Sequence, residues 1–505
     1  MEIPRGQLLR ADSFEADETL RCDVVVIGTG AGGAAAGMRL AEAGLSVVFL
    51  EEGRKWEAHE LSNKQSWAVR NLYAERGTSL ALGNIFLPMP RGKAVGGTTL
   101  INSGICFRTP DFVLKRWREQ YGVAWADLDG LAPTFQTIED AVGAVRTDES
   151  VWRRHNELFR DGCVALKLEG HQAIVRNAPG CVGCGLCQVG CPVGGKGSVD
   201  RNLIPRALAA GAAVLSCARA TKVLVENGVA VGVEAYGVDP VLEQRKRRIE
   251  VRAKKVFLCA GAVSTPSFLL RQKLANSNGR VGKNLHVHTA LGVVGKFDEV
   301  VDGWHGAVQG YFVRLPGENA VLETFSASPD IYSVQYEVYS KPMRQLRHLA
   351  ACGVMIGDTA EGTVSPGANE PRSFVSYDTN AEDVRVIKKG IRQISAIYFA
   401  AGATEVHTGF SRSSPLKSLA ELDALLAEPR PWDQMNIYAS HPMSSCAMGA
   451  DKAWSVVKPD GETWDVKNLV IADASVFPTS LGVNPQITVM TVASTIAQLQ
   501  LKAGG

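Results

Sequence analysis

Four of the eleven cysteines of this sequence fall within one short segment, "CVGCGLCQVGCPVGGKG". They are Cys181, Cys184, Cys187 and Cys191, and Pro192 follows the last of them. The spacing C-x2-C-x2-C-x3-C-P is that of a bacterial ferredoxin segment, whose thiolates bind iron. Short spacers let one loop wrap a cluster, and backbone N–H groups can point at its sulfurs. The segment predicts an iron–sulfur site, with three-iron and four-iron clusters both open.

Other interpretations of the cysteine segment stay open beside this one. A structural zinc usually takes two C-x2-C pairs that are well separated, so a single compact run suits zinc less well. Ordinary structural thiols are a further alternative. A four-iron cluster would need a fourth ligand, either Cys191 or a distant cysteine such as Cys163. Disulfides are the weakest interpretation, because the count is odd and the N-terminus, "MEIPRGQLLRADSFEADETLRCD", has no apolar run. We therefore expect no signal peptide and a cytoplasmic protein with reduced thiols.

A second stretch, "CDVVVIGTGAGGAAAGMRLAEAGLSVVFLEEG", has the pattern of a dinucleotide-binding unit. Gly28, Gly30 and Gly33 fit G-x-G-x-x-G between a β-branched strand and a small-residue helix. A second strand ends at Glu51, where an acid can hold ribose hydroxyls while the helix N-terminus binds the pyrophosphate. The order of strand, turn, helix, strand and acid predicts an adenine dinucleotide, and this unit by itself does not distinguish FAD from NAD.

Composition sets broad limits on fold and partners. The 505 residues can bury a large core in two domains or lobes. A net charge of +2 gives no reason to expect nucleic acid or an anionic membrane as partner. No window is apolar and long enough to span a bilayer. We expect an α/β chain (α+β overall).

Four further stretches occur in a recognisable order: "RGKAVGGTTLIN", "KKVFLCAGAVSTPSFLL", "ASHPMSSCAMGAD" and "NLVIADASVFPTSLGVNPQITVMTVASTIAQL". Together with the dinucleotide unit, they resemble the glucose–methanol–choline (GMC) family of FAD oxidoreductases, from about residue 21 to residue 497. Several short stretches of the sequence are similar to the bacterial branch of the family that is related to long-chain alcohol oxidases. The cysteine segment resembles that of iron–sulfur-containing GMC sugar dehydrogenases.

The resemblance implies a Rossmann-like FAD-binding domain and a second, antiparallel-sheet substrate domain. The FAD-binding domain would be discontinuous, with residues 1–110, 196–290 and 436–505. The substrate domain would comprise residues 111–180 and 291–435, and residues 181–195 would form the cysteine-rich loop. Candidate strands of the substrate domain are "AVQGYFVRL", "FVSYDT" and "YSVQYEVYS" (Tyr332–Ser340).

The resemblance also implies the residues that carry the chemistry. The family's base lies in its H-P element, here His441, and a second group follows the D-A-S strand, here Asn484. Neutral histidine suits removal of a hydroxyl proton near neutral pH, and an amide can donate to the alkoxide oxygen. Some relatives tether FAD through a histidine where this chain has Ile101, so we expect non-covalent FAD. The predicted cofactor-binding residues are Gly28, Gly30, Gly33, Glu51, Gly96, Gly97, Asn102, Val223, Ala260, Gly261, Asp473, Asn484, Pro485 and Thr488.

The function that these features predict is oxidation of an alcohol to a carbonyl by hydride transfer to FAD. A cluster beside the flavin would favour a dehydrogenase that passes electrons to an acceptor protein or a quinone-linked carrier. The alternatives are an oxidase that uses oxygen, with structural cysteines, and a lyase that keeps FAD without redox turnover. Lipid alcohols, aromatic alcohols, sugars and steroids are all compatible substrates.

Overall fold

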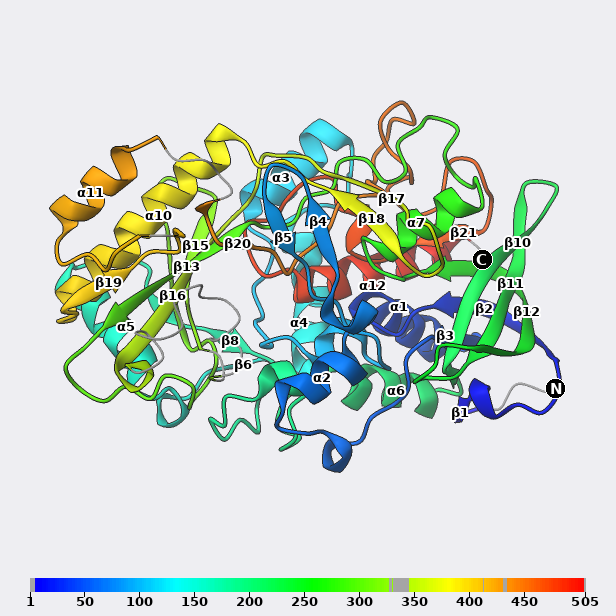
Figure 1. Cartoon of the computed structure of the whole chain (residues 1–505). Helices are drawn as coiled ribbons and strands as arrows, with labels where there is room; N and C mark the ends of the chain where they lie inside the picture. Colours follow the sequence, from blue (N-terminus) through cyan, green and yellow to red (C-terminus); the bar gives the residue numbers. More distant parts are fainter. Residues whose placement is uncertain (1–4, 327–328, 330–344, 412, 430–433, 504–505) are drawn as a thin grey trace.

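A computed structural model describes residues 5–326, 329, 345–411, 413–429 and 434–503. Two large sheets lie toward opposite ends of the molecule, and both termini lie at the end of the first sheet (Figure 1). The predicted strand Tyr332–Ser340 lies outside the described residues.

The first sheet has eight strands in the order β1-β9-β3-β2-β12-β11-β10, with β21 beside β12. Its centre is parallel, because β2 pairs with β3 and β12, and β3 pairs with β9, in that sense. The basic run after residue 243 forms the antiparallel β11–β12 hairpin. The strands are β1 (Leu8–Arg10), β2 (Glu18–Ile27), β3 (Val47–Glu51), β9 (Ala213–Ser216), β10 (Ala218–Glu226), β11 (Val229–Val238), β12 (Arg245–Leu258) and β21 (Leu469–Ile471).

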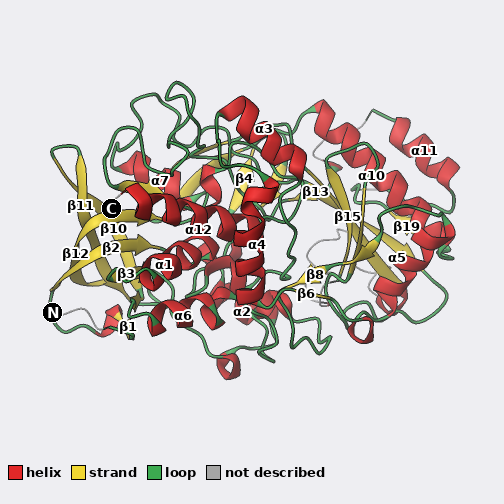
Figure 2. Cartoon of the chain, turned by 180° about the vertical axis from the view of Figure 1, so that it is seen from behind, coloured by secondary structure: helices red, strands yellow, loops and turns green. Residues whose placement is uncertain are grey.

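Helices built from small residues pack beside this sheet (Figure 2). Helix α1 (Ala31–Glu42) packs against α12 (Gln486–Ala503) and α6 (Leu203–Ala209). A Cβ atom at Gly37 of α1 would lie 2.1 Å from the Phe49 ring, so only glycine allows this close approach to the sheet. Helix α4 (Leu128–Val142) packs on α12, and α3 (Asp111–Tyr121) is joined to the C-terminal region by the hydrogen bond of Trp117 Nε1 to Thr479 Oγ1. The predicted Rossmann-like unit is confirmed.

The second sheet has seven strands in the order β19-β13-β16-β15-β14-β7, with β20 beside β13, and its pairs are antiparallel. One face lies under α10 (Ala381–Ala400) and α5 (Arg154–Ala165), and α11 (Leu419–Ala427) packs on α10. Alternate residues of β15 and β16 are left for the other face. The strands are β7 (Gln172–Ala173), β13 (Ala290–Lys296), β14 (Tyr311–Arg314), β15 (Ala320–Phe325), β16 (Leu349–Ile356), β19 (Glu405–His407) and β20 (Ile437–Tyr438). The segment "AVQGYFVRL" supplies β14, as predicted.

A four-stranded sheet, β17-β18-β4-β5, joins distant parts of the chain. The segment "FVSYDT" enters this sheet as β18, which pairs with β4, and not the seven-stranded one. This sheet unites parts of the predicted residues 1–110 and 291–435, and the domain boundaries stay a prediction. The elements not yet given are β4 (Leu80–Leu82), β5 (Phe86–Pro88), β17 (Thr363–Pro366), β18 (Ser373–Ser376), β6 (Val145–Arg146), β8 (Val175–Arg176), α2 (Gln65–Leu72) and α7 (Ser264–Arg271).

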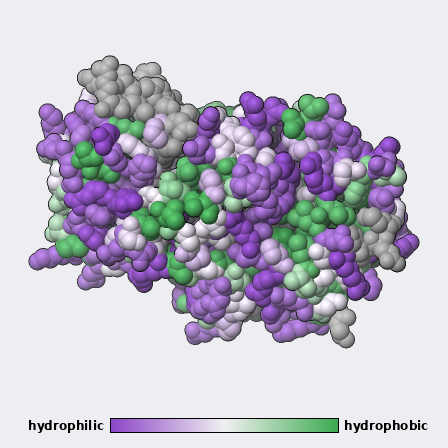
Figure 3. All heavy atoms as spheres, turned by 90° about the horizontal axis from the view of Figure 1, so that it is seen from below, coloured by the Kyte–Doolittle hydropathy of each residue, from purple (hydrophilic) through white to green (hydrophobic). Residues whose placement is uncertain are grey.

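Polar side chains cover most of the face shown in Figure 3, and apolar groups are scattered between them. Within the described part of the chain, no helix combines the length and the apolar character that crossing a bilayer requires.

Candidate active site

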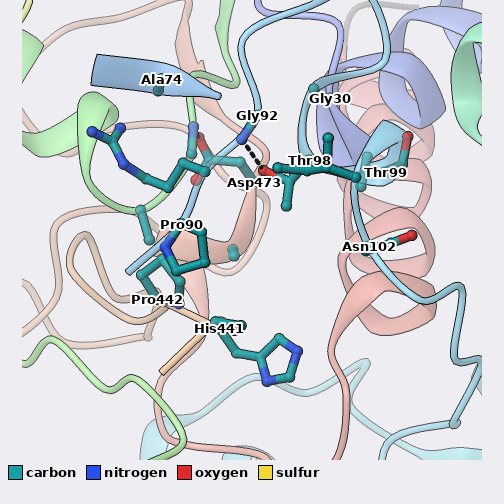
Figure 4. A pocket seen from close by; sticks show the side chains of 18 of the residues that line it. Gly30, Ala74, Pro90, Gly92, Thr98, Thr99, Asn102, His441, Pro442 and Asp473 are labelled. Carbon is teal, nitrogen blue, oxygen red and sulfur yellow. Dashed lines mark hydrogen bonds between the residues drawn. The ribbon is translucent and has the colours of Figure 1, made fainter. Parts of the chain in front are cut away.

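A cavity of about 490 Å³ is bordered by residues of both large sheets. Figure 4 shows that His441 and Pro442 from one segment and Thr98, Thr99 and Asn102 from another border the same space. Loops that follow β2 and β12 line one part of the cavity, and side chains of β15 and β16 line another. The site therefore combines the carboxyl ends of parallel strands with one face of an antiparallel sheet.

The glycine turn after β2 brings bare backbone to the cavity. Gly28 has φ +97°, and a Cβ atom there would lie 2.5 Å from the carbonyl oxygen of Cys259. A Cβ atom at Gly97 would lie 2.8 Å from the Cα atom of Gly30, so only glycine at position 97 allows this close approach of the two loops. Gly33 does not line the cavity; a Cβ atom there would lie 2.1 Å from the Gly28 oxygen, which makes it a packing residue. The N-terminus of α1 at this turn favours an anion.

Glu51 ends β3 and lines the cavity from a buried position. One carboxylate oxygen accepts hydrogen bonds from the backbone N–H and the hydroxyl of Thr29, at 3.0 Å and 2.7 Å. The other accepts from the backbone N–H of Gly53 at 2.9 Å. Burial raises the pKa of Glu51 to about 7, against these hydrogen bonds. The carboxylate is held in place and keeps lone pairs for further donors such as ribose hydroxyls.

A second acid, Asp473, joins the loop after β12 to the C-terminal region. It accepts hydrogen bonds from the Gly261 N–H at 2.8 Å and from the Thr265 hydroxyl at 2.6 Å. Ala260, Gly261 and Asp473 all line the cavity. Burial raises the pKa of Asp473 above its usual range. The acid fixes the course of the loop beside the turn at Gly28.

The loop after residue 91 supplies another wall. Gly96 donates from its N–H to the Thr29 hydroxyl at 3.2 Å, and the Asn102 amide donates to Gln486 Oε1 at 2.9 Å. Gly97 and Asn102 line the cavity, and Gly96 directly precedes Gly97 in the sequence. Buried Lys196 donates to the carbonyl oxygens of Leu100, Asn102 and Cys187 at 2.7–3.1 Å. This lysine ties the cavity loop to the cysteine segment.

His441 lines the cavity opposite this loop. Its Nδ1 atom is buried and has no hydrogen-bond partner among the described residues. A neutral ring that carries its hydrogen on Nδ1 has the lone pair of Nε2 to accept a proton. Burial lowers the pKa of His441 to about 3, and the neighbouring His288 contributes in the same direction. The imidazole is therefore neutral at physiological pH, the state that a general base requires.

His288 is the nearest ring to His441, with centroids 5.4 Å apart and planes at 76°. Its Nε2 atom accepts hydrogen bonds from the backbone N–H groups of Leu481 and Gly482, at 3.1 Å and 2.9 Å. Two donors on Nε2 place the proton of the neutral ring on Nδ1. The residue has φ +52° and is fully buried, so the fold holds a strained backbone there to keep this ring in the wall of the cavity.

Asn484 and Pro485 line the cavity just before α12 begins at Gln486. The Asn484 amide nitrogen lies 3.4 Å from Glu323 Oε2, and the amide oxygen is buried with no partner among the residues described. The second hydrogen of this amide can serve a ligand, and the N-terminus of α12 favours negative charge beside it. The structure brings Asn484 and His441 to one cavity.

Family models match most of the chain. The model described as GMC oxidoreductase matches residues 69–290 and, with its C-terminal counterpart, residues 358–493. A model described as an FAD binding domain matches residues 23–63. The chain belongs to the GMC oxidoreductase family. It is an FAD-dependent oxidoreductase that acts on CH–OH groups.

Two relatives illustrate the range of this similarity. An uncharacterized GMC-type oxidoreductase of Mycobacterium tuberculosis is 35% identical over 98% of this chain and 78% of its own length. A long-chain-alcohol oxidase of Arabidopsis thaliana is 30% identical over 98% of this chain and 69% of its own length.

Two solved structures share the fold of this GMC oxidoreductase. Pyridoxine 4-oxidase from Mesorbium loti has a TM-score of 0.69 at 17% identity, over 94% of this chain and 98% of its own. A formate oxidase of Aspergillus oryzae has a TM-score of 0.73 at 15% identity, over 97% and 99%. These likenesses show the architecture.

The chemistry of this cavity fits FAD, because bare glycine backbone, a helix N-terminus and the buried acid Glu51 border one space. Besides Gly33 and Gly96, two more predicted residues, Val223 and Thr488, are not among those that line the cavity. Val223 lies on β10, where its N–H donates to Gln272, and the cavity-lining residues of that strand are Ala218 to Ala220. Thr488 lies in α12 and shares a hydrogen bond with Thr109 at 2.9 Å. The sequence pattern of a strand does not show how far along the strand the cavity lies, as for Val223. The pattern of a helix does not show which turn borders the ligand, as for Thr488.

The cysteine segment lies beside the cavity but does not form a metal centre in this structure. Gln188, within the segment, lines the cavity, and its carbonyl accepts from the Tyr73 hydroxyl at 3.0 Å. Arg176 donates to Cys187 Sγ at 3.0 Å and lies 3.9 Å from Cys181 Sγ. Among the described residues, no three histidine, cysteine or acidic side chains come together as a metal site. The predicted ligand set is therefore not assembled in this structure.

Sequence reasoning left several cavity residues without a role. His288 lies in "VGKNLHVH", which resembles a family segment whose role is structural or near the pocket, but its packing against His441 is visible only in three dimensions. Glu323 lies on β15 of the second sheet and Gln309 lies two residues before β14, both outside the family motifs. Arg91 begins a motif, yet its ion pair with Glu75 at 2.9 Å is visible only in three dimensions. An acid inside an otherwise apolar strand was the one available signal for Glu323.

Proposed function

We propose that this GMC oxidoreductase converts an alcohol to a carbonyl compound, with His441 as the base and Asn484 as the donor to the reacting oxygen. The observation that carries the proposal is a half-buried imidazole on the wall of the cavity, whose lowered pKa keeps it neutral at physiological pH. The relatives named as alcohol oxidases support the same class of substrate.

An alcohol hydroxyl loses its proton with difficulty near neutral pH. His441 Nε2 would accept this proton while the carbon of the same group loses hydrogen with its electron pair. FAD, when bound, supplies the acceptor for that hydride. Asn484 would donate to the oxygen as negative charge develops there, and His288 would hold the His441 ring in position by packing against it.

We propose that the residues which line the cavity divide between the two tasks. Gly28, Gly30, Gly97 and Glu51 would hold the dinucleotide through backbone N–H groups and one carboxylate. Asn102, Ala260, Gly261, Asp473 and Pro485 would border the cofactor from the other loops. Gly96 would support the same loop from beside the cavity. Gly33 would act through packing of α1.

Anaerobic reduction by substrate tests the proposed activity. We expect a panel of alcohols to bleach the flavin absorbance without oxygen, with a carbonyl product in equal amount. A lyase would leave the flavin oxidised, which would refute the proposal. Oxygen consumption coupled to peroxide would then distinguish an oxidase from a dehydrogenase.

We propose that FAD is held without a covalent bond. Ile101, at the position of the tether in some relatives, is an aliphatic residue that lines the cavity. Acid precipitation should release all the yellow colour into the supernatant, and colour in the washed pellet would contradict this.

Electron transfer through an iron–sulfur cluster to an acceptor protein or a quinone-linked carrier is a separate proposal. Two buried cations support it: Arg176 and Lys196, 1% and 2% exposed, have no ion pair in the part of the chain that the structure describes. Burial lowers the pKa of Lys196 to about 8. Buried cations next to thiols are compensated when thiolates or a thiolate-bound cluster carry the negative charge. Cys187 is buried and Cys181 half-buried, so the segment reaches from the cavity toward the surface.

Metal analysis of protein prepared without oxygen tests this second proposal. We expect iron and sulfide, lost when Cys181, Cys184 or Cys187 is replaced by Ser, with flavin reduction by alcohol retained. Cys191→Ser would keep a three-iron centre and degrade a four-iron one. Stoichiometric zinc, or no metal, would refute the cluster and favour the oxidase.

A further inference from the structure

The substrate side of the cavity is formed by the free face of the second sheet. Its lining is mainly apolar, with Val308, Phe325 and Met355 among its residues. Into this face β15 brings one carboxylate, Glu323, which pairs across the sheet with Gly353 of β16. An acid in an apolar wall is costly unless its hydrogen bonds are completed.

The surroundings of Glu323 leave that requirement unmet. The residue is 4% exposed. Its Oε2 atom accepts from the Gln309 amide at 2.9 Å and lies 3.4 Å from the Asn484 amide nitrogen. Its Oε1 atom is buried and has no hydrogen-bond partner within the described part of the chain. No ion pair to Glu323 occurs among the described residues, and burial raises its pKa to about 7.

A purely structural role does not account for a carboxylate here. A glutamine would accept the same hydrogen bonds from Gln309 and Asn484 without burying a charge. The unpartnered oxygen distinguishes the acid from Glu51 and Asp473, whose oxygens are served by the chain itself. What Glu323 lacks is one more donor, and the cavity that it lines is where a ligand could supply it.

We propose that Glu323 is a specificity-determining residue that accepts a hydrogen bond from a second donor group of the alcohol substrate. This inference rests on the proposed function. Because Asn484 contacts Glu323 and would also serve the reacting oxygen, the second donor belongs on a carbon close to the reacting carbon. The substrate class is then an alcohol with an apolar body and a neighbouring hydroxyl or ammonium group.

Matched alcohols of one chain length test this. Flavin reduction would be measured anaerobically with n-hexanol, the vicinal hexanediol, the hexanediol with both ends hydroxylated, and the vicinal amino alcohol. We expect the wild-type protein to prefer a vicinal donor over n-hexanol by about 10- to 100-fold in kcat/KM, the value of a hydrogen bond to a charged group. The diol with distant hydroxyls should resemble n-hexanol. Comparison of the vicinal diol with the amino alcohol identifies the donor.

The variant Glu323→Leu should bring the ratio between vicinal diol and n-hexanol to about one, and Glu323→Gln should retain part of the preference for the diol. Phe325→Leu, on the same strand, is the matched control and should alter both alcohols alike. A wild-type ratio near one, or a ratio unchanged in Glu323→Leu, would overturn the inference. An equal loss for every alcohol would also overturn it, because it would assign Glu323 to positioning Asn484.

A binding measurement separates this inference from the proposed function. Thermal stabilisation of the FAD-loaded protein by the vicinal diol should exceed that by n-hexanol, and Glu323→Leu should remove the difference. If no alcohol reduces the flavin, the proposed function fails, and the binding difference still decides the role of Glu323. Equal stabilisation by both alcohols would contradict that role. FAD content confirms that each variant is folded.

Discussion

Glu51 and Glu323 are both buried acids in one cavity, and burial raises the pKa of each to about 7. The chain completes the hydrogen bonds of Glu51 with two backbone N–H groups and a hydroxyl. Among the residues that the structure describes, only side-chain amides donate to Glu323, and one of its oxygens has no partner. On the proposed cofactor side, around Glu51, most of the donors are backbone N–H groups. On the proposed substrate side, around Glu323, the donors are side chains.

This difference explains why one side of the site is encoded in motifs and the other is not. Backbone N–H groups reach a ligand only where glycine permits close approach, as at Gly28 and Gly97. Few residue types can replace glycine at such positions. A side-chain wall such as that around Glu323 and Phe325 can change with substrate while the sheet stays the same. The following predictions separate the two sides.

The largest expected effect is that of His441→Ala. Loss of a general base should lower the rate of flavin reduction by alcohol by about 10²–10⁴-fold. FAD stoichiometry should be unchanged, because the cofactor side does not depend on this ring. Rapid mixing without oxygen measures the rate, and His348→Ala, which is not among the cavity-lining residues, is the control. Equal rates in both variants would disprove the role of His441.

Removal of the amide donor in Asn484→Ala should lower the same rate by about 10²-fold, the lower end for loss of one donor to a developing oxyanion. The amide also contacts Glu323, so a smaller part of the loss will appear as weaker substrate binding. Asn71→Ala, in α2, serves as the control. A change in FAD retention without a change in rate would move Asn484 to the cofactor side of the comparison.

On the cofactor side, Glu51→Gln should weaken FAD binding by about 10- to 100-fold, since a charge-assisted acceptor is replaced by a neutral one. The reduction rate of protein saturated with FAD should stay close to that of the wild type. Titration of apoprotein with FAD gives the affinity, with Glu42→Gln at a surface ion pair as the control. An unaltered affinity would mean that Glu51 serves only the chain around it.

The smallest expected effect is that of pH on His441. Burial lowers the pKa of this ring to about 3, so acidification protonates it only well below the usual value for histidine. The base therefore stays neutral between about pH 5 and pH 8. The rate of flavin reduction should be measured against pH in the Glu323→Gln variant, which lacks the carboxyl group whose pKa is about 7. This rate should show no titration midpoint near pH 6.5. Such a midpoint, abolished in His441→Ala, would show that the ring titrates as an exposed histidine does.

The sequence alone determined the parts of this protein that depend on local backbone chemistry. The turn at Gly28 and the acid Glu51 that ends the second strand follow from residue type and spacing, whereas His441 was indicated by the resemblance to the GMC family. The cysteine spacing was equally clear, yet the structure does not assemble a metal site from these thiols, and that prediction stays open to direct test.

Only the tertiary structure decided the rest. It placed Val223 away from the cavity lining, set His288 against His441, and turned Glu323 of the second sheet toward Asn484. The residues of each pair, His288 with His441 and Glu323 with Asn484, are roughly 150 positions apart in the sequence but lie close together at the cavity. Contacts between such distant residues produce no periodicity or motif in the sequence. The proposed cofactor-binding residues lie in short sequence motifs. The proposed choice of substrate depends instead on which side chains of the second sheet the tertiary structure brings to the cavity.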